Sequence, residues 1–284
     1  MNEHVKELIA MSLSEDVGAG DVTSMYFVPE EAQALARVKV KDEGVIAGLA
    51  VAQEVCAQVD ESIEVRALKE DGAVVSYGDY VMEWRGSARS ILTAERAALN
   101  FLQRLSGVAT KTYSYSSLIA HTECRLLDTR KTTPGWRWLE KMAVRAGGGY
   151  NHRMGLYDRA MVKDNHLVAE DSLSFIQAGI HRLKQEQPNV EVELEADTLQ
   201  QVSDFLKLEG VDYILLDNMP PAQLVEALAL RAQSGSDVAL EASGGVTHET
   251  IAEIAETGVD YVSVGALTHS AVALDISLEF IPQG

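Results

Sequence analysis

A repeating unit runs from about residue 124 towards the C-terminus: a short apolar strand, a polar strand end and a helix. The predicted strands are Arg125–Asp128, Ala160–Lys163, Val190–Glu195, Tyr213–Asp217, Val238–Glu241 and Tyr261–Val264. The predicted helices between them are Trp136–Ala146, Leu173–Gln185, Leu199–Leu208, Ala222–Ala232 and Glu249–Glu256. Strands that alternate with helices form parallel sheets. The pattern therefore restricts this region to an open doubly wound sheet or a barrel with fewer than eight strands.

Polar residues at the strand ends favour the barrel. These ends read Asp128-Thr-Arg-Lys131, Lys163-Asp-Asn-His166, Glu195, Asp217-Asn218, Ser243-Gly-Gly245 and Gly265-Ala-Leu-Thr-His269. In a (β/α) barrel the carboxyl ends of all strands meet on one rim, where the active site lies. We therefore expect an open (β/α) barrel of about six parallel strands in residues 116–270.

The first part of the chain, residues 1–115, predicts a separate mixed α/β domain. Alternation in Ala36–Lys41 is typical of a half-buried strand, and Leu49–Val59 is expected to be a helix. An apolar stripe at helical spacing predicts a long helix that ends near Gly107; its residues are Ile91, Ala94, Ala98, Leu102 and Leu105. The C-terminal residues 271–284 are expected to pack away from the barrel, most simply on this first domain.

A basic island lies within this acidic chain. Residues 125–163 hold nine Lys or Arg and three acids, whereas the whole chain has a formal charge of −19. Two like charges ~4 Å apart repel by roughly 4 kcal/mol at an effective dielectric of ~20, so such crowding indicates a site for a polyanion. A pI near 4.7 argues against nucleic acid, which needs an extended basic face. No apolar run reaches the ~20 residues of a membrane span. Two cysteines without a C-x-x-C pair suit a reducing, cytoplasmic setting.

Five residues of the island are candidate anion ligands because they stand at predicted strand ends or after a helix: Arg130, Lys131, His152, Arg153 and Lys163. Arginine binds carboxylate or phosphate through two parallel hydrogen bonds, and lysine acts as a point charge. The remaining basic residues are expected to form a solvated face, namely Arg137, Lys141, Arg145 and Arg159. Taken alone, His152 is more often a structural histidine.

Glycines and acids complete the expected site. Ser243, Gly244 and Gly245 precede a helix, and glycine admits a phosphate close to the backbone. Gly265 and Ala266 offer further amides at the next strand end. Glu195 and Asp217 end neighbouring strands, and two converging carboxylates suit Mg²⁺. They could equally pair with Lys163 and the arginines.

The ordered motifs resemble those of the nicotinate-nucleotide pyrophosphorylase (carboxylating) family, also called quinolinate phosphoribosyltransferase. The matching segments are Glu15–Thr23, Thr93–Asn100, Leu105–Thr110, Asp128–Gly135, Gly147–Asp158, Lys163–His166, Leu215–Asn218, Glu241–Gly245 and Val264–His269. The chain departs from the family at Trp136-Arg-Trp138 and Ala146, which we interpret as packing changes, with a narrowed pocket as the alternative for Trp136. The resemblance implies an N-terminal α/β sandwich domain and an open barrel, in a homodimer or a larger assembly of dimers.

The resemblance also implies the reaction and the residue roles. The family joins quinolinate to 5-phosphoribosyl-1-pyrophosphate and forms nicotinate mononucleotide, pyrophosphate and CO₂ in NAD biosynthesis. Arg130, Lys131, His152 and Arg153 match its quinolinate-binding positions, and Arg96 matches an arginine supplied by the other subunit. Lys163 matches a catalytic lysine near both substrates, and Glu195 and Asp217 match acids for Mg²⁺ and ribose. Ser243, Gly244, Gly245, Gly265 and Ala266 fall at the 5′-phosphate contacts. Glu193 is a rival for the place of Glu195, because both point to one face of a strand.

Three other functions would fit part of this pattern. A paralogue that uses nicotinate would leave part of the cation cluster without a carboxylate. An aldolase or isomerase with Lys163 as a Schiff-base amine would leave the arginines without an anion. A non-catalytic sensor of phosphoribosyl compounds would not need both Glu195 and Asp217. The diacid quinolinate remains the expected substrate.

Overall fold

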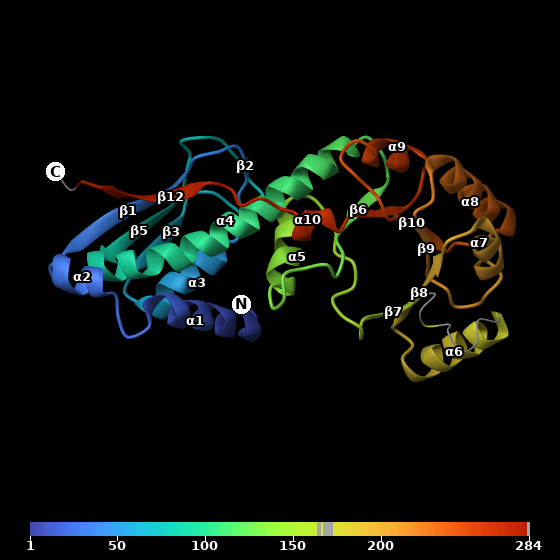
Figure 1. The fold of residues 1–284 in the computed structure, drawn as a ribbon, viewed down its shortest axis with the longest axis horizontal. Helices are drawn as coiled ribbons and strands as arrows, with labels where there is room; N and C mark the ends of the chain where they lie inside the picture. Colours follow the sequence, from blue (N-terminus) through green and yellow to red (C-terminus); the bar gives the residue numbers. More distant parts are fainter. Residues whose placement is uncertain (164–165, 167–172, 283–284) are drawn as a thin grey trace. The chain divides into compact units, whose positions relative to one another are not determined.

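The computed structural model describes residues 1–163, 166 and 173–282, and the chain divides into two compact units. Unit 1 comprises residues 1–113, 132–148 and 267–284, and unit 2 comprises 114–131 and 149–266. The expected domains, 1–115 with 271–284 and 116–270, differ from these units chiefly at residues 132–148. Figure 1 shows the elements of both units. None of the helices within the described ranges is long and apolar enough to cross a membrane.

Unit 1 is built on an antiparallel sheet with strand order β12-β1-β5-β3. These strands are β1 (Gln33–Val40), β3 (Glu64–Ala67), β5 (Tyr80–Ser87) and β12 (Ile276–Ile281), and a small second sheet pairs β2 (Gly44–Val45) with β4 (Val74–Val75). Buried and less buried residues alternate along β1, as the sequence predicts for a strand with one covered face. The C-terminal strand β12 joins this sheet by pairing with β1.

Helices complete unit 1. They are α1 (Glu3–Val17), α2 (Val22–Phe27), α3 (Leu49–Val59), the first part of α4 (Ala88–Leu118), α5 (Arg137–Ala146) and most of α10 (Ala266–His269). The expected apolar stripe of α4 is fully buried, but the helix does not end near Gly107. A Cβ at Gly107 would lie 2.0 Å from the carbonyl oxygen of Val272, so this glycine permits a close backbone approach instead of ending the helix.

Unit 2 contains the six predicted parallel strands in the order β6-β11-β10-β9-β8-β7. Their bounds are β6 (Arg125–Leu127), β7 (Arg159–Val162), β8 (Glu191–Ala196), β9 (Tyr213–Asp217), β10 (Ala239–Ser243) and β11 (Tyr261–Ser263). Neighbouring strands of this sheet pair in parallel throughout the described residues. The sheet is open because β6 and β7, consecutive in sequence, stand at opposite ends of this order. The expected α/β fold with an open barrel of six strands is confirmed.

The connecting helices of unit 2 also follow the sequence pattern. They are α6 (Leu173–Glu186), α7 (Leu199–Phe205), α8 (Pro221–Ser234) and α9 (Ile251–Glu256). Thr198 caps α7 through a capping box with Gln201, and Gly235 ends α8 in the left-handed conformation. The helix between β6 and β7 is α5, which belongs to unit 1. The carboxyl ends of the six parallel strands frame a pocket, and all the residues that line it belong to unit 2.

Candidate active site

A pocket of about 500 Å³ lies at the carboxyl ends of the parallel strands in unit 2. It is lined by Thr129, Arg130, Lys131, His152, Arg153, Met161, Lys163, Glu195, Leu215, Asp217, Asn218, Glu241, Ser243, Gly244, Gly245 and Ser263. The lining combines cations from the segments beside β6 and β7 with acids and glycines from β8, β9 and β10. The predicted site residues are thus largely brought together, with three exceptions described below.

The first wall of the pocket is cationic. Arg130 and Lys131 follow β6, and Arg153 precedes β7. Burial and the neighbouring Arg130 lower the pKa of Arg153, which is the physical sign of crowded like charges. Nη1 of Arg153 donates a hydrogen bond to the carbonyl oxygen of Arg159 at 3.0 Å, so its guanidinium is held in place. This wall can bind an anion with more than one negative group.

The second wall carries the acids. Lys163, directly after β7, donates a hydrogen bond to Glu195 on β8 and forms an ion pair with it. Asp217 ends β9, and its Oδ2 accepts a hydrogen bond from Nδ2 of Asn218 at 2.6 Å. Glu195 pairs with Leu215 in the parallel register, so the acids come from neighbouring strands. Of the motif Lys163–His166, residues 164–165 lie outside the described residues.

The glycine turn after β10 fits against the end of β9. Gly244 has φ +87°, and a Cβ there would lie 2.3 Å from Oδ1 of Asn218. Asn218 itself has φ 55°, and its backbone N–H donates to the carbonyl oxygen of Ser243 at 2.8 Å. Two left-handed residues thus interlock, an arrangement that a side chain at position 244 would break. The turn leaves Ser243 and Gly245 facing the pocket as candidate phosphate contacts.

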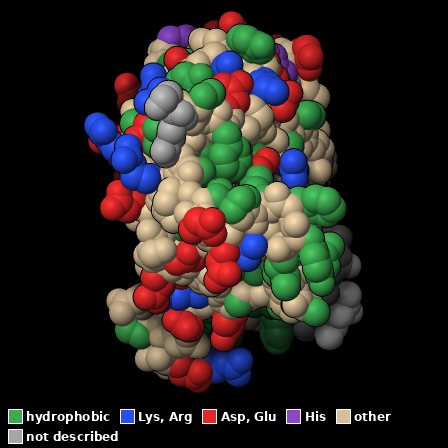
Figure 2. Space-filling view, turned by 90° about the vertical axis from the view of Figure 1, so that its left-hand side faces the viewer, with side chains coloured by type: hydrophobic (Ala, Val, Ile, Leu, Met, Phe, Trp, Pro, Cys, Tyr) green, Lys and Arg blue, Asp and Glu red, His purple; other side chains and the backbone are tan. Residues whose placement is uncertain are grey.

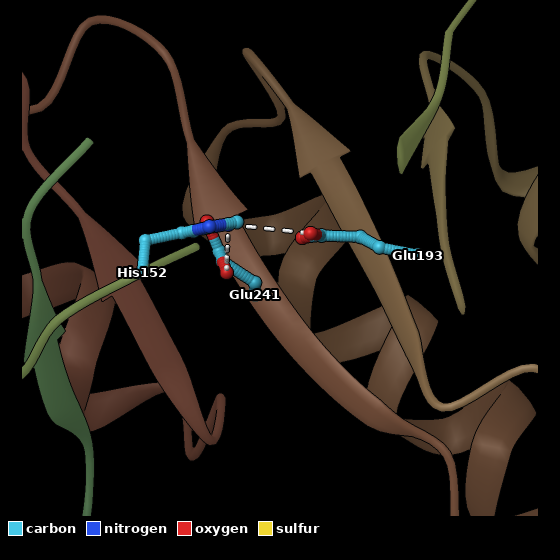
Figure 3. Close-up of side chains that lie close together, drawn as sticks. All are labelled: His152, Glu193 and Glu241. Carbon is cyan, nitrogen blue, oxygen red and sulfur yellow. Dashed lines mark ion pairs between the residues drawn. The ribbon is translucent and has the colours of Figure 1, made fainter. Parts of the chain in front are cut away.

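A buried cluster at the pocket is drawn in Figure 3. His152 points between Glu193 on β8 and Glu241 on β10, and both carboxylates are 0% exposed. Nε2 of His152 lies 3.2 Å from Oε2 of Glu193 and 3.4 Å from Oε2 of Glu241. Glu193 is therefore engaged with His152, whereas Glu195, two residues further along the same strand, is engaged with Lys163.

The charges of this cluster shift one another's titration. Burial alone lowers the pKa of His152, but the two carboxylates more than offset this and raise it to about 9. Burial, aided by the negative charge of Glu193, raises the pKa of Glu241 despite His152. Burial also acts to raise the pKa of Glu193, yet His152 and Arg159 bring it below its ordinary value. The three groups together therefore hold a proton at neutral pH.

Three predicted site residues do not line this pocket. Arg96 is an exposed residue of α4 and belongs to unit 1. Gly265 and Ala266 follow β11 at the same sheet edge, but the lining residue from that strand is Ser263. Their roles stay predictions.

Sequence reasoning missed some of the lining. The lining residues that were not predicted as site residues are Thr129, Met161, Leu215, Asn218, Glu241 and Ser263, although Glu241 stands in the motif Glu241–Gly245. The expectation of a solvated basic face was wrong at two positions. Lys141 is only 2% exposed, and Arg159 lies on β7 in ion pairs with Glu191 and Glu193. Lys141 is buried because of its position on α5, and Arg159 is enclosed because of its position on β7. The charge pattern of the sequence does not show either position.

Comparison with known proteins agrees with this arrangement. The model of the quinolinate phosphoribosyl transferase N-terminal domain matches residues 21–106, and that of the C-terminal domain matches residues 108–279. A probable nicotinate-nucleotide pyrophosphorylase [carboxylating] of Bacillus subtilis is 40% identical over 97% of this chain and 93% of its own length. The chloroplastic nicotinate-nucleotide pyrophosphorylase of Oryza sativa is 41% identical over 97% of this chain and 77% of its length. The solved nicotinate-nucleotide pyrophosphorylase of Francisella tularensis superposes with a TM-score of 0.90 at 38% identity, covering 99% and 97% of the two chains.

The fold and the pocket define the class of the protein: it is an enzyme with an open (β/α) barrel whose active site binds a polyanion. Within that class, the chain belongs to the quinolinate phosphoribosyl transferase family.

Proposed function

We propose that the pocket of unit 2 joins quinolinate to 5-phosphoribosyl-1-pyrophosphate and produces nicotinate mononucleotide, pyrophosphate and CO₂, as a decarboxylating pentosyltransferase of NAD biosynthesis. The observation that carries the proposal is a single pocket with a cationic wall, an acidic wall and a glycine turn. Quinolinate is a dicarboxylate and the second substrate is a polyphosphate, so both match the basic side of the pocket.

The cationic wall is assigned to quinolinate. Arg130, Lys131 and Arg153 approach the pocket from two segments, which suits a ligand with two carboxylates. His152 lines the same pocket. Ser243, Gly244 and Gly245 are assigned to the 5′-phosphate, with Gly265 and Ala266 as further contacts, because backbone N–H groups at such turns bind phosphate oxygens.

The acidic wall is assigned to Mg²⁺ and the ribose. Carboxylate oxygens are the protein ligands that Mg²⁺ prefers, and it takes one or two of them beside substrate phosphate. Glu195 and Asp217 line one pocket from neighbouring strands, so the donor set fits. When bound, Mg²⁺ neutralises charge on the pyrophosphate leaving group. In this assignment Lys163 exchanges its bond with Glu195 for contacts to the substrates.

The residues then serve two steps. In the first, the pyridine nitrogen forms a bond to the anomeric carbon as the bond to pyrophosphate breaks, and nearby carboxylates such as Glu195 and Asp217 stabilise the positive charge that develops there. In the second, the carbon–carboxylate bond breaks beside the quaternised nitrogen, CO₂ leaves, and the electron pair left on the ring carbon takes up a proton. The arginines must orient the carboxylates without over-stabilising the one that leaves.

A homodimer, or a larger assembly of dimers, completes the proposal, with Arg96 reaching the neighbour's site. Arg96 is exposed on α4, so a partner chain can reach it. Hydrophobic side chains gather on the face of unit 1 seen in Figure 2. Four large hydrophobic residues of the short helix α2 are more than half exposed, namely Val22, Met25, Tyr26 and Phe27. Apolar surface of this kind favours a second copy as its cover.

We also propose a cytoplasmic location. Both cysteines, Cys56 and Cys124, are buried free thiols, which suits a reducing compartment. Relatives named chloroplastic or mitochondrial exist, so fractionation of the source cells is the appropriate test.

The substrate is tested by incubation with 5-phosphoribosyl-1-pyrophosphate and Mg²⁺, with either quinolinate or nicotinate, while CO₂ and mononucleotide are followed. Mononucleotide and CO₂ from quinolinate, in equal amounts, are expected. Mononucleotide formed only from nicotinate would replace the proposal with the paralogous activity. Absence of product from either acid would contradict phosphoribosyl transfer altogether.

A further inference from the structure

Two fully buried carboxylates, Glu193 and Glu241, have no part in the substrate contacts assigned above. They project from β8 and β10 towards one imidazole (Figure 3). Removing a carboxylate from water is costly unless a positive or hydrogen-bonding group compensates. The compensating groups are His152, with Nε2 at 3.2 and 3.4 Å, and Arg159, whose Nη1 lies 3.5 Å from Oε2 of Glu193, while the Ser263 hydroxyl also favours the charged form of Glu241. Two buried acids are thus committed to holding His152.

The other edge of the same imidazole holds the backbone. Nδ1 of His152 accepts a hydrogen bond from the backbone N–H of Arg153 at 2.7 Å. Oδ1 of the fully buried Asp128 accepts the backbone N–H of His152 at 2.8 Å, and Oδ2 accepts Nδ2 of Asn151 at 2.7 Å. Nδ1 thus faces the backbone, and Nε2 faces the two carboxylates. Each ring nitrogen therefore has a defined partner.

A continuous set of contacts runs from the buried acids to the cationic wall. Glu193 and Glu241 fix the ring of His152, the ring fixes the backbone of Arg153, and the Arg153 guanidinium bonds to the carbonyl oxygen of Arg159. This last bond goes to the backbone of Arg159 and not to its guanidinium, which pairs with Glu193 and, at 2.8 Å, with Glu191. A shift of the imidazole would therefore move the backbone that carries Arg153.

We propose that Glu193 and Glu241 are positioning residues that hold His152, and through it Arg153, in the geometry that binds the substrate carboxylates. The inference rests on the proposed function for the identity of that substrate. It gives the acids of β8 separate tasks: Glu195 faces the pocket with Lys163, and Glu193 orders the cationic wall.

The same three side chains also offer a metal donor set, with their ligand atoms within 4.8 Å of one another. The surroundings disfavour a cation there. Arg159 approaches Glu193, and Arg153 and Arg130 crowd the adjoining wall. A divalent ion would have to compete with these fixed positive charges and with the proton on Nε2. The positioning role needs no such displacement.

The kinetic test compares Glu193→Gln and Glu241→Gln with Glu191→Gln. Glu191 is a matched control because it lies on β8 and pairs with Arg159, as Glu193 does, but its described hydrogen bonds and ion pair run to Arg159 and Tyr213 and not to His152. The two cluster variants should raise the KM for quinolinate by about tenfold to a hundredfold, the range expected when a ligand is misplaced by ~1 Å. The KM for 5-phosphoribosyl-1-pyrophosphate should change less than about twofold, and the control should match the wild type.

A double-mutant comparison separates positioning from simple loss of packing. If Glu241 acts through His152, then His152→Asn with Glu241→Gln should raise the quinolinate KM no more than His152→Asn alone. Independent, multiplying effects would overturn the proposal. So would cluster variants that raise both KM values equally, or that match Glu191→Gln.

Two further measurements do not depend on turnover. In ¹⁵N-histidine-labelled protein, the Nε2–H signal of His152, identified by its loss in His152→Asn, should shift in Glu241→Gln and stay in place in Glu191→Gln. An unshifted signal would contradict the proposal even if the wild type proved inactive on quinolinate. Stoichiometric binding of Mn²⁺ alone that survives Asp217→Asn and disappears in Glu241→Gln would show a metal centre and overturn it as well.

Discussion

Lys163 donates a hydrogen bond to Glu195, so a lysine and an acid that were both predicted to serve substrate are engaged with each other across neighbouring strand ends. The lysine side chain is 38% exposed and the acid 12%, and an ion pair of this exposure adds little stability, about 0 to 1 kcal/mol. The pair is therefore better suited to exchange partners than to hold the fold.

From this we predict that Glu195→Gln lowers kcat/KM by about a hundredfold or more, the usual cost of removing a charge that stabilises a transition state. The free energy of unfolding should change by less than about 1 kcal/mol. Steady-state kinetics and urea denaturation of the same preparations measure both. Asp197→Asn, at an exposed position just beyond β8, is the control and should match the wild type. A large loss of stability in Glu195→Gln would show that the pair is structural.

Gly244 and Gly245 offer a second, paired prediction. A methyl group at Gly244 meets Asn218, with the nearest atom at 2.3 Å, whereas at Gly245 the nearest atom is 3.9 Å away. Both residues have positive φ, so alanine at either position destabilises the fold by about 1 kcal/mol through its left-handed backbone. Only Gly244→Ala adds a steric clash.

Gly244→Ala should therefore lose about 1 to 3 kcal/mol more stability than Gly245→Ala. It should also raise the KM for 5-phosphoribosyl-1-pyrophosphate further, because Asn218 and the end of β9 must move. Thermal denaturation and kinetics of the two variants decide the matter. Equal effects of the two alanines would mean that the turn relaxes around the new side chain.

The sequence predicted which residues lie at the strand ends, but it did not predict how far along a strand each side chain meets its partner. The alternation of strands and helices predicted every strand of the barrel, and the polar end of each strand predicted most of the pocket. Glu193 and Glu195 both point inward, so side-chain alternation could not separate them. What separates them is their height along β8: Glu193 meets His152, and Glu195 meets Lys163. Such heights follow from strand register, which a single sequence does not contain.

The sequence pattern also did not predict which unit contains α5. Its position between two barrel strands predicts a barrel helix, yet residues 132–148 belong to unit 1. The reason lies in partners distant in sequence. Trp136, just before α5, stacks on Phe101 of α4 with ring centroids 4.7 Å apart, and the fully buried Glu140 binds Arg104. Trp136 is therefore a packing residue of unit 1, as the packing interpretation of this departure supposed.

The Arg104–Glu140 pair yields a stability prediction. Nη2 of Arg104 lies 2.9 Å from Oε1 of Glu140, which also accepts from the Thr133 hydroxyl at 2.8 Å, and Oε2 accepts the Thr133 backbone N–H at 3.1 Å. Arg104→Met should destabilise the protein by about 3 to 5 kcal/mol, because it leaves a buried carboxylate without its cation. Arg37→Met, which breaks a more exposed pair with Glu83, is the control and should cost less than about 1 kcal/mol. Urea denaturation gives both values, and similar costs would contradict the argument.

The buried histidine predicts a pH dependence of stability. The pKa of His152 is raised to about 9 in the folded protein, against about 6.5 in an unfolded chain. A raised pKa stabilises the folded state fully below about pH 6.5, and this contribution disappears as the pH rises through about 9. Compared with His152→Asn, the wild type should therefore lose up to about 3 kcal/mol of its advantage between pH 6 and pH 9.5. Urea denaturation at a series of pH values measures the difference, and a constant difference would show that the ring does not titrate in this window.

The last prediction concerns Arg96 and Arg153. Arg153 lines the pocket of unit 2, and Arg96 is exposed in unit 1, which leaves it available to another chain. If Arg96 completes the neighbour's site, each active site needs two chains. Arg96→Ala and Arg153→Ala should each remove turnover and keep the fold, since a charged contact to a substrate carboxylate is worth about 2 to 5 kcal/mol. Circular dichroism checks the fold of both variants.

Mixing the two variants distinguishes a shared site from a site within one chain. A heterodimer of Arg96→Ala with Arg153→Ala contains one site that lacks both arginines and one that has both. Activity should therefore return in the mixture, to about half the wild-type value per heterodimer, in proportion to the heterodimer measured by native mass spectrometry. A mixture with abundant heterodimer and no more activity than either parent would place Arg96 in its own chain's site or outside the site altogether. In that case the exposed face of α4 would need another explanation.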